Sequence, residues 1–127
     1  MADHINIIKI KPGVAFHPAM FTAPAMMHMV DTVTGCAPEN YNPTITSGCE
    51  GIHKKDSKHY KGRALDFRIR DLSRETAEQW ADRITGRLGF CYTVILKSNH
   101  IHIQYDGAKN GKTKTLRTKG ILGNAGK

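Results

Sequence analysis

Residues 92–105 read YTVILKSNHIHIQY and contain the clearest β pattern of the chain. Two β-rich runs, 92–96 and 101–105, flank a polar Lys-Ser-Asn turn, which predicts a β-hairpin. Successive side chains of a strand point to opposite faces of its sheet. In the second run one face is apolar and suited to packing (Ile101, Ile103, Tyr105), and the other is polar (His100, His102, Gln104, Asp106). The hairpin therefore predicts a sheet that is buried on one side and polar on the other.

Two earlier segments predict further strands. Residues 44–47 are mostly β-branched and predict a short strand that stops at Gly48. Residues 63–69 alternate in polarity, which predicts a second strand with Asp66 on the face away from its apolar side chains.

Two helices are predicted from capping signals and apolar spacing. The first spans residues 24–34, with Pro24 in its first turn and Gly35 at its end. The second has Ser73 as its N-cap and closes at Gly89. The order helix, strand, strand, helix, strand, strand predicts an α+β fold with a small, mostly antiparallel sheet and flanking helices.

Length and composition limit the class of protein. A chain of 127 residues with 39% apolar residues forms one domain with its own core. Its three cysteines leave one unpaired, which argues against a disulfide framework. Every apolar stretch is shorter than the about 20 residues that cross a bilayer, so we expect no membrane span. The N-terminus lacks a secretory pattern, and we expect cytoplasmic synthesis without a signal peptide.

The positive charge is concentrated at the C-terminal end. The net charge is +8, and the residues after Asp106 include six basic and no acidic side chains. The sequence thus predicts a domain over residues 1–106 and a basic, flexible tail over 107–127. Such a tail either keeps the protein soluble or attracts a polyanion, such as nucleic acid or an acidic cell-wall polymer. It contains no aromatic residue that could stack on bases.

Histidines and acids gather in two short segments of the chain. Catalytic zinc takes three protein ligands from His and carboxylate groups and keeps a fourth position open. His59, Asp66 and one of His100 or His102 provide such a set. Seven extended residues would separate His59 from Asp66 by about 23–25 Å, so the chain must fold back, and Gly62 permits that turn. The alternative is a group of ordinary surface histidines, but the combination favours one bound zinc ion.

The segment SKHYKGRALD, residues 57–66, resembles the S-x-H-x-x-G-x-A-x-D motif of the D-Ala-D-Ala and L-Ala-D-Glu zinc peptidases. These enzymes are related to lysostaphin-type enzymes and to the Hedgehog N-terminal domain. His-Ile-His at 100–102 resembles their H-x-H motif, and Thr-Ser-Gly at 46–48 resembles their strand-end T-S-G. The resemblance extends from about Pro18 to Asp106 and implies a Hedgehog/DD-peptidase-like fold.

The resemblance also implies a role for each matching residue. His59, Asp66 and His102 would bind zinc, and His100 would assist in stabilising the oxyanion. The family has an acidic general base three residues before the last ligand, where this chain has Asn99. An amide cannot accept a proton at neutral pH. The chain is then an inactivated variant, a naturally impaired relative, or an enzyme with another base.

Other positions bear on that base and on the substrate. Asp106 shares a strand face with His102, but four extended residues span about 13 Å, so it is a poor replacement base. His53 and Asp56, in the loop before His59, are the alternative bases that could approach the metal more closely. Many relatives have an Arg soon after T-S-G that grips a substrate carboxylate, whereas this chain has Cys-Glu at 49–50. Arg63 or Arg68 is the candidate for that role. Ser57 of the motif is a further candidate substrate-binding residue.

These features predict a zinc metallopeptidase that hydrolyses a stem-peptide or cross-link amide bond of peptidoglycan, of the D-Ala-D-Ala (carboxypeptidase) or L-Ala-D-Glu type. The compact size and basic tail suit a monomeric bacteriophage endolysin, or a virion-associated enzyme, that acts on the bacterial cell wall after release. One alternative is a non-catalytic, zinc-containing cell-wall-binding domain. Another is a nucleic-acid-binding protein that works through the tail.

Overall fold

The computed structural model describes residues 7–49, 62–107 and 114–117. Its elements confirm the α+β class. In chain order they are β1 (Lys9–Ile10), α1 (Ala19–Thr22), α2 (Pro24–Gly35), β2 (Thr44–Ser47), β3 (Ala64–Arg68), α3 (Arg74–Leu88), β4 (Tyr92–Leu96), β5 (His100–Tyr105) and β6 (Lys114–Arg117).

The strands form one mixed sheet in the order β1-β2-β3-β5-β4-β6. The central pairs, β2 with β3, β3 with β5 and β4 with β5, are antiparallel, as the sequence predicts. Both outermost pairs, β1 with β2 and β4 with β6, are parallel. Neither β1 nor β6 is predicted from the sequence, and β6 lies within the segment predicted as a basic tail.

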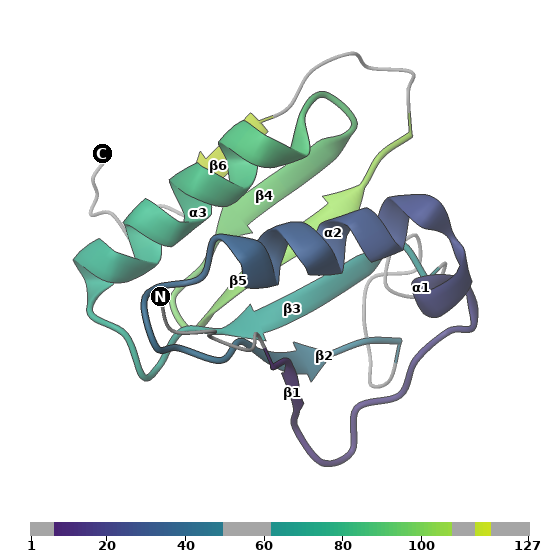
Figure 1. Ribbon diagram of the computed structural model, residues 1–127, viewed down its shortest axis with the longest axis horizontal. Helices are drawn as coiled ribbons and strands as arrows, with labels where there is room; N and C mark the ends of the chain where they lie inside the picture. Colours follow the sequence, from purple (N-terminus) through teal and green to yellow (C-terminus); the bar gives the residue numbers. More distant parts are fainter. Residues whose placement is uncertain (1–6, 50–61, 108–113, 118–127) are drawn as a thin grey trace, which may run out of the picture.

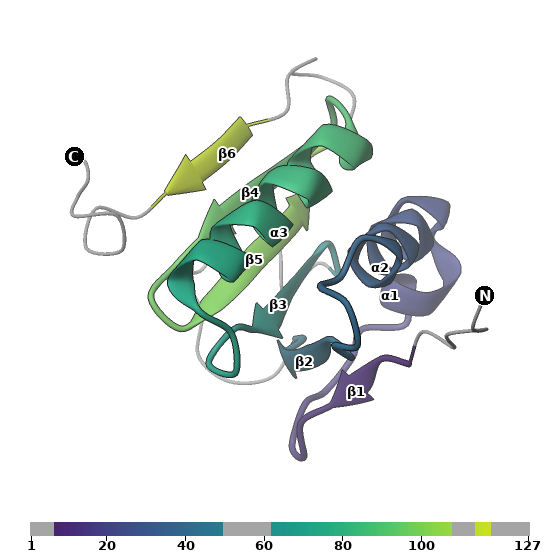
Figure 2. The ribbon, with the colours of Figure 1, turned by 60° about the vertical axis from the view of Figure 1, so that its left-hand side comes forward.

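Helices α2 and α3 lie side by side on one face of the sheet (Figures 1 and 2). The core between helices and sheet includes Trp80 and Ile84 of α3, Phe67 of β3 and Ile103 of β5, all of them fully buried. Burying such side chains stabilises the fold by about 1.5–3 kcal/mol each. The indole Nε1 of Trp80 also donates to the carbonyl oxygen of Val33, 3.3 Å away, and so joins the two helices.

The ends of α3 follow the predicted signals. The hydroxyl of Ser73 accepts a hydrogen bond from the backbone N–H of Thr76 at 3.1 Å, as an N-cap does. Gly89 ends the helix with a φ of +88°, an angle that glycine adopts at little cost. Within the described ranges, no helix has the length and apolar character needed to span a membrane.

Gly62 sets the entry of the chain into β3. Its φ is +71°, and an added Cβ would lie 2.8 Å from Nδ1 and 2.9 Å from Cβ of His17. Only a residue without a side chain fits this turn. Gly62 thus has the kind of backbone angle that the predicted turn needs, whereas the predicted return of the chain toward His59 lies outside the described residues.

Candidate functional site

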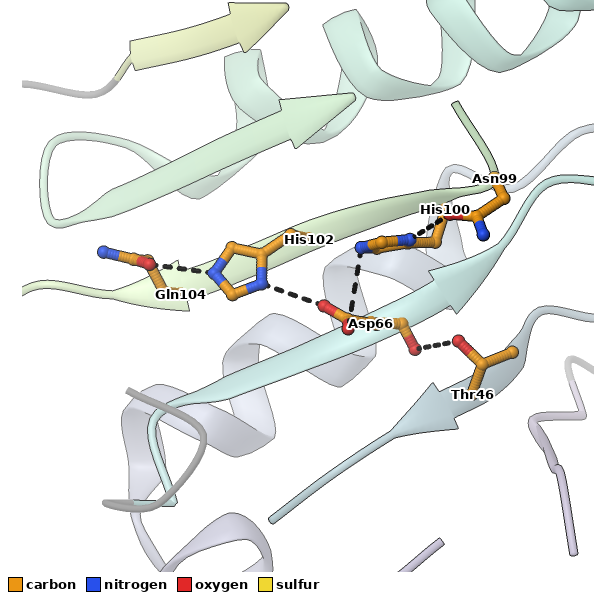
Figure 3. A network of polar contacts seen from close by, with 6 residues as sticks. All are labelled: Thr46, Asp66, Asn99, His100, His102 and Gln104. Carbon is orange, nitrogen blue, oxygen red and sulfur yellow. Dashed lines mark hydrogen bonds and ion pairs between the residues drawn. The ribbon is translucent and has the colours of Figure 1, made fainter. Parts of the chain in front are cut away.

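The polar site lies on the face of the sheet opposite the helices, at the centre of β3 and β5 (Figure 3). On both strands, the side chains of odd-numbered residues such as Phe67 and Ile103 enter the core. Asp66 and His102 alternate with these residues and pair directly with each other across the two strands. Side chains of such a pair are in reach of one another. Residues distant in sequence thus meet because β3 and β5 are neighbours.

Asp66 contacts both histidines of the H-x-H segment. Its Oδ1 lies 2.9 Å from Nδ1 of His102, and its Oδ2 lies 3.6 Å from Nε2 of His100. Asp66 is only 8% exposed and His102 only 9%. Charged and polar groups interact more strongly when shielded from water, so burial strengthens the contact between Asp66 and His102.

The other ring nitrogen of His102 continues the polar network along β5. Nε2 lies 2.8 Å from Oε1 of Gln104, and Nε2 of Gln104 donates to Oδ1 of Asp106 at 2.6 Å. The hydroxyl of Thr93, on β4, donates to Oδ2 of Asp106. The sequence predicts Gln104 and Asp106 on the polar face but gives neither a role. Their spacing of two and four residues from His102 was the available signal.

Asn99 occupies the position of the expected general base. It is exposed, directly before β5, and its Oδ1 lies 2.5 Å from Nδ1 of His100. His100 is therefore held between an amide on one side and the carboxylate of Asp66 on the other (Figure 3).

The two candidate arginines lie in different surroundings. Arg68 is on the same face of β3 as Asp66 and pairs in register with His100. Arg63 precedes β3, and its guanidinium carbon lies 5.9 Å from the ring centroid of Tyr105. Of the two, the structure brings Arg68 to the site.

Several predicted residues lie outside the described residues, namely His53, Asp56, Ser57 and the predicted zinc ligand His59. Within the ranges that are described, no group of three His, Cys, Asp or Glu side chains is arranged to hold a metal ion. Cys36, Cys49 and Cys91 are free thiols, as expected without a disulfide framework.

The donor set of the described residues nevertheless fits zinc in kind. Imidazole nitrogen and carboxylate oxygen are both zinc ligands, and Asp66 and His102 present one of each within 2.9 Å. A zinc-binding histidine usually directs its other ring nitrogen to an oxygen acceptor, as His102 does toward Gln104.

No protein-family model, curated protein or solved structure matches this chain.

Proposed function

We propose that this protein is a zinc-dependent peptidase of bacterial peptidoglycan, with a Hedgehog/DD-peptidase-like fold. The observation that carries the proposal is the contact between Asp66 and His102 on adjacent strands, with His100 beside them. Two of the three ligands that the motif implies are thus neighbours, although they are far apart in the sequence. The bond cleaved would be a D-Ala-D-Ala or L-Ala-D-Glu amide of the stem peptide or cross-link.

His59, Asp66 and His102 would hold the ion. Bound zinc would supply a Lewis acid that polarises an amide carbonyl and lowers the pKa of water. His100 borders the same carboxylate, and an N–H of its ring is suited to stabilise negative charge that develops on the carbonyl oxygen.

Arg68 would bind the substrate. Arg68 lies on the polar face of β3 and pairs in register with His100, and a guanidinium pairs with a carboxylate through two parallel hydrogen bonds. Stem peptides carry such carboxylates. We propose a monomer that is made in the cytoplasm and acts on the wall after release, with the basic residues after Asp106 attracted to anionic wall polymers.

Asn99 favours a second candidate function. The residue in the base position cannot take up a proton, and its Oδ1 is occupied by His100. The same site would then belong to a zinc-containing domain that binds the cell wall without cutting it.

The experiment that decides between these functions is mass spectrometry of purified peptidoglycan after incubation with the zinc-loaded protein. Asn99→Asp restores an acidic base beside His100, and general bases contribute about 10²–10⁴-fold to rate. We therefore expect Asn99→Asp to release stem-peptide fragments about 10²-fold or more faster than the unsubstituted chain.

The matched control is the double variant Asn99→Asp, His102→Ala, which has the base but lacks a proposed zinc ligand and should release nothing. If no variant releases fragments while the zinc-loaded protein sediments with the wall, the non-catalytic candidate replaces the peptidase. If the protein neither binds zinc nor sediments with the wall, both candidates are wrong.

A further inference from the structure

We infer that Gln104, Asp106 and Thr93 are positioning residues that fix which nitrogen of His102 is presented to the metal ion. The inference rests on the proposed zinc site. It adds a function to three side chains to which the motif assigns none. They form a continuous hydrogen-bonded chain from β4 to the ring of His102.

The orientation of this chain follows from the chemistry of its members. An ionised carboxylate only accepts hydrogen bonds. Asp106 therefore accepts from the hydroxyl of Thr93 through Oδ2 and from the amide nitrogen of Gln104 through Oδ1. With its NH₂ group directed to Asp106, Gln104 turns its oxygen toward His102. The carboxylate thus determines which end of the amide faces the imidazole.

The amide oxygen in turn selects the tautomer of the imidazole. A neutral imidazole has one N–H and one lone pair. Because Oε1 of Gln104 accepts at 2.8 Å from Nε2, the proton belongs on Nε2 and the lone pair on Nδ1. Nδ1 is the nitrogen that lies 2.9 Å from Oδ1 of Asp66. The lone pair on Nδ1 and the carboxylate oxygen repel each other unless a positive charge lies between or beside them. The hydrogen bonds through Gln104 therefore leave His102 and Asp66 with two acceptors that can bind one cation together.

The positions of these residues in the sheet support the hydrogen-bonded series, because they place its side chains on one face. Thr93 pairs in register with Gln104 across β4 and β5, and both side chains lie on the polar face. Gln104 and Asp106 follow His102 at intervals of two residues, which keeps all three on that face. Partners that orient zinc-binding histidines contribute about 10- to 100-fold to metal affinity.

The experiment compares zinc affinity, by competition with a chromophoric chelator, and the ¹⁵N shifts of the His102 ring in the metal-free protein with the ring neutral. Gln104→Leu removes the acceptor at similar volume. We expect it to weaken zinc binding by about 10- to 100-fold and to abolish the preference for the proton on Nε2. Gln79→Leu, on the exposed side of α3, is the matched control and should change neither quantity.

The double variant Gln104→Glu, Asp106→Asn tests whether residues 104 and 106 set the tautomer of His102, because it exchanges their groups and keeps the hydrogen bonds between them. The introduced carboxylate would accept from His102 and from the introduced amide, whose oxygen would in turn accept from Thr93. We expect this exchange to restore the tautomer and most of the affinity, which a loss of packing at position 104 would not predict.

The outcomes separate this inference from the proposed function. If the unsubstituted chain binds no zinc, the proposed zinc site is wrong, and so is the positioning role that rests on it. If it binds zinc and Gln104→Leu binds equally tightly with the same ring shifts, only the positioning role is wrong. If Gln104→Leu loses affinity but the double variant does not recover it and the tautomer is unchanged, position 104 acts through packing and the inference is overturned.

Discussion

At the scale of single residues, two glycines show how local geometry limits substitution. Gly62 has a φ of +71°, and a Cβ added there would lie within 2.9 Å of the ring and Cβ of His17, so a side chain at this position is strained. Gly86, inside α3, has no heavy atom within 4 Å of the position that a Cβ would take. A substitution by alanine is therefore sterically unfavourable at Gly62 and unobstructed at Gly86.

We expect Gly62→Ala to lower the free energy of unfolding by about 1–3 kcal/mol, because it combines an unfavourable φ with a steric conflict at His17. Gly86→Ala is the control and should raise it by about 0.5–1 kcal/mol, since glycine is a poor residue within a helix. Denaturant titration of both variants measures the two effects. Equal effects at both positions would contradict the proposed turn at Gly62.

At the scale of elements, Tyr92 joins β4 to α2. Its ring is buried, and its hydroxyl donates to the carbonyl oxygen of Ala25 at 2.7 Å. Burial, with smaller contributions from Tyr105 and Cys91, raises the pKa of Tyr92 from 10.0 to about 12. The contact between the strand and the helix thus requires a neutral phenol.

This raised pKa predicts how stability depends on pH. In the unfolded chain Tyr92 ionises near its ordinary pKa of 10.0, whereas in the folded protein it stays neutral up to about 12. Its contribution is therefore complete below about pH 10 and is lost as the pH rises through 12. We expect the unfolding free energy of the unsubstituted chain to fall more steeply across this pH window than that of Tyr92→Phe. Parallel curves for the two proteins would refute the assignment to Tyr92.

At the scale of the whole molecule, the site depends on the centre of the sheet and not on its edges. Asp66 and His102 lie on β3 and β5, and the supporting residues Thr93 and Asp106 also precede residue 107. Strand β6 lies on the far side of β4 and pairs with it in parallel.

Truncation after Gly107 tests this division. Removing β6 exposes the edge of β4, and each lost ladder hydrogen bond contributes about 1 kcal/mol net, so we expect unfolding free energy to fall by a few kcal/mol. We expect zinc affinity to stay unchanged, because every described residue of the site remains. We expect the truncated protein to bind anionic wall polymer more weakly than the full chain. A truncated protein that folds but no longer binds zinc would show that the site extends beyond Gly107.

Much of the fold could be predicted because its signals are local. The N-cap at Ser73, the glycine at 89 and the alternation in β5 each act within a few residues, and α3, β4 and β5 lie where these signals predict them. The edge strands β1 and β6 could not be predicted, since a strand of two residues has no measurable alternation and β6 lies in a segment dominated by charge.

In the candidate site, too, some features follow from the local sequence and others depend on how the strands pair. The alternation of side chains alone determines that His100, His102 and Gln104 share a polar face, because it is a property of any extended strand. That Asp66 lies against His102, 36 residues away, depends on β3 pairing with β5 in one register. The same register places Arg68, and not Arg63, opposite His100. The connection of Gln104 through Asp106 to Thr93 requires β4 on the other side of β5. Strand order and register are set by the packing of the whole sheet against α2 and α3, which no local pattern encodes.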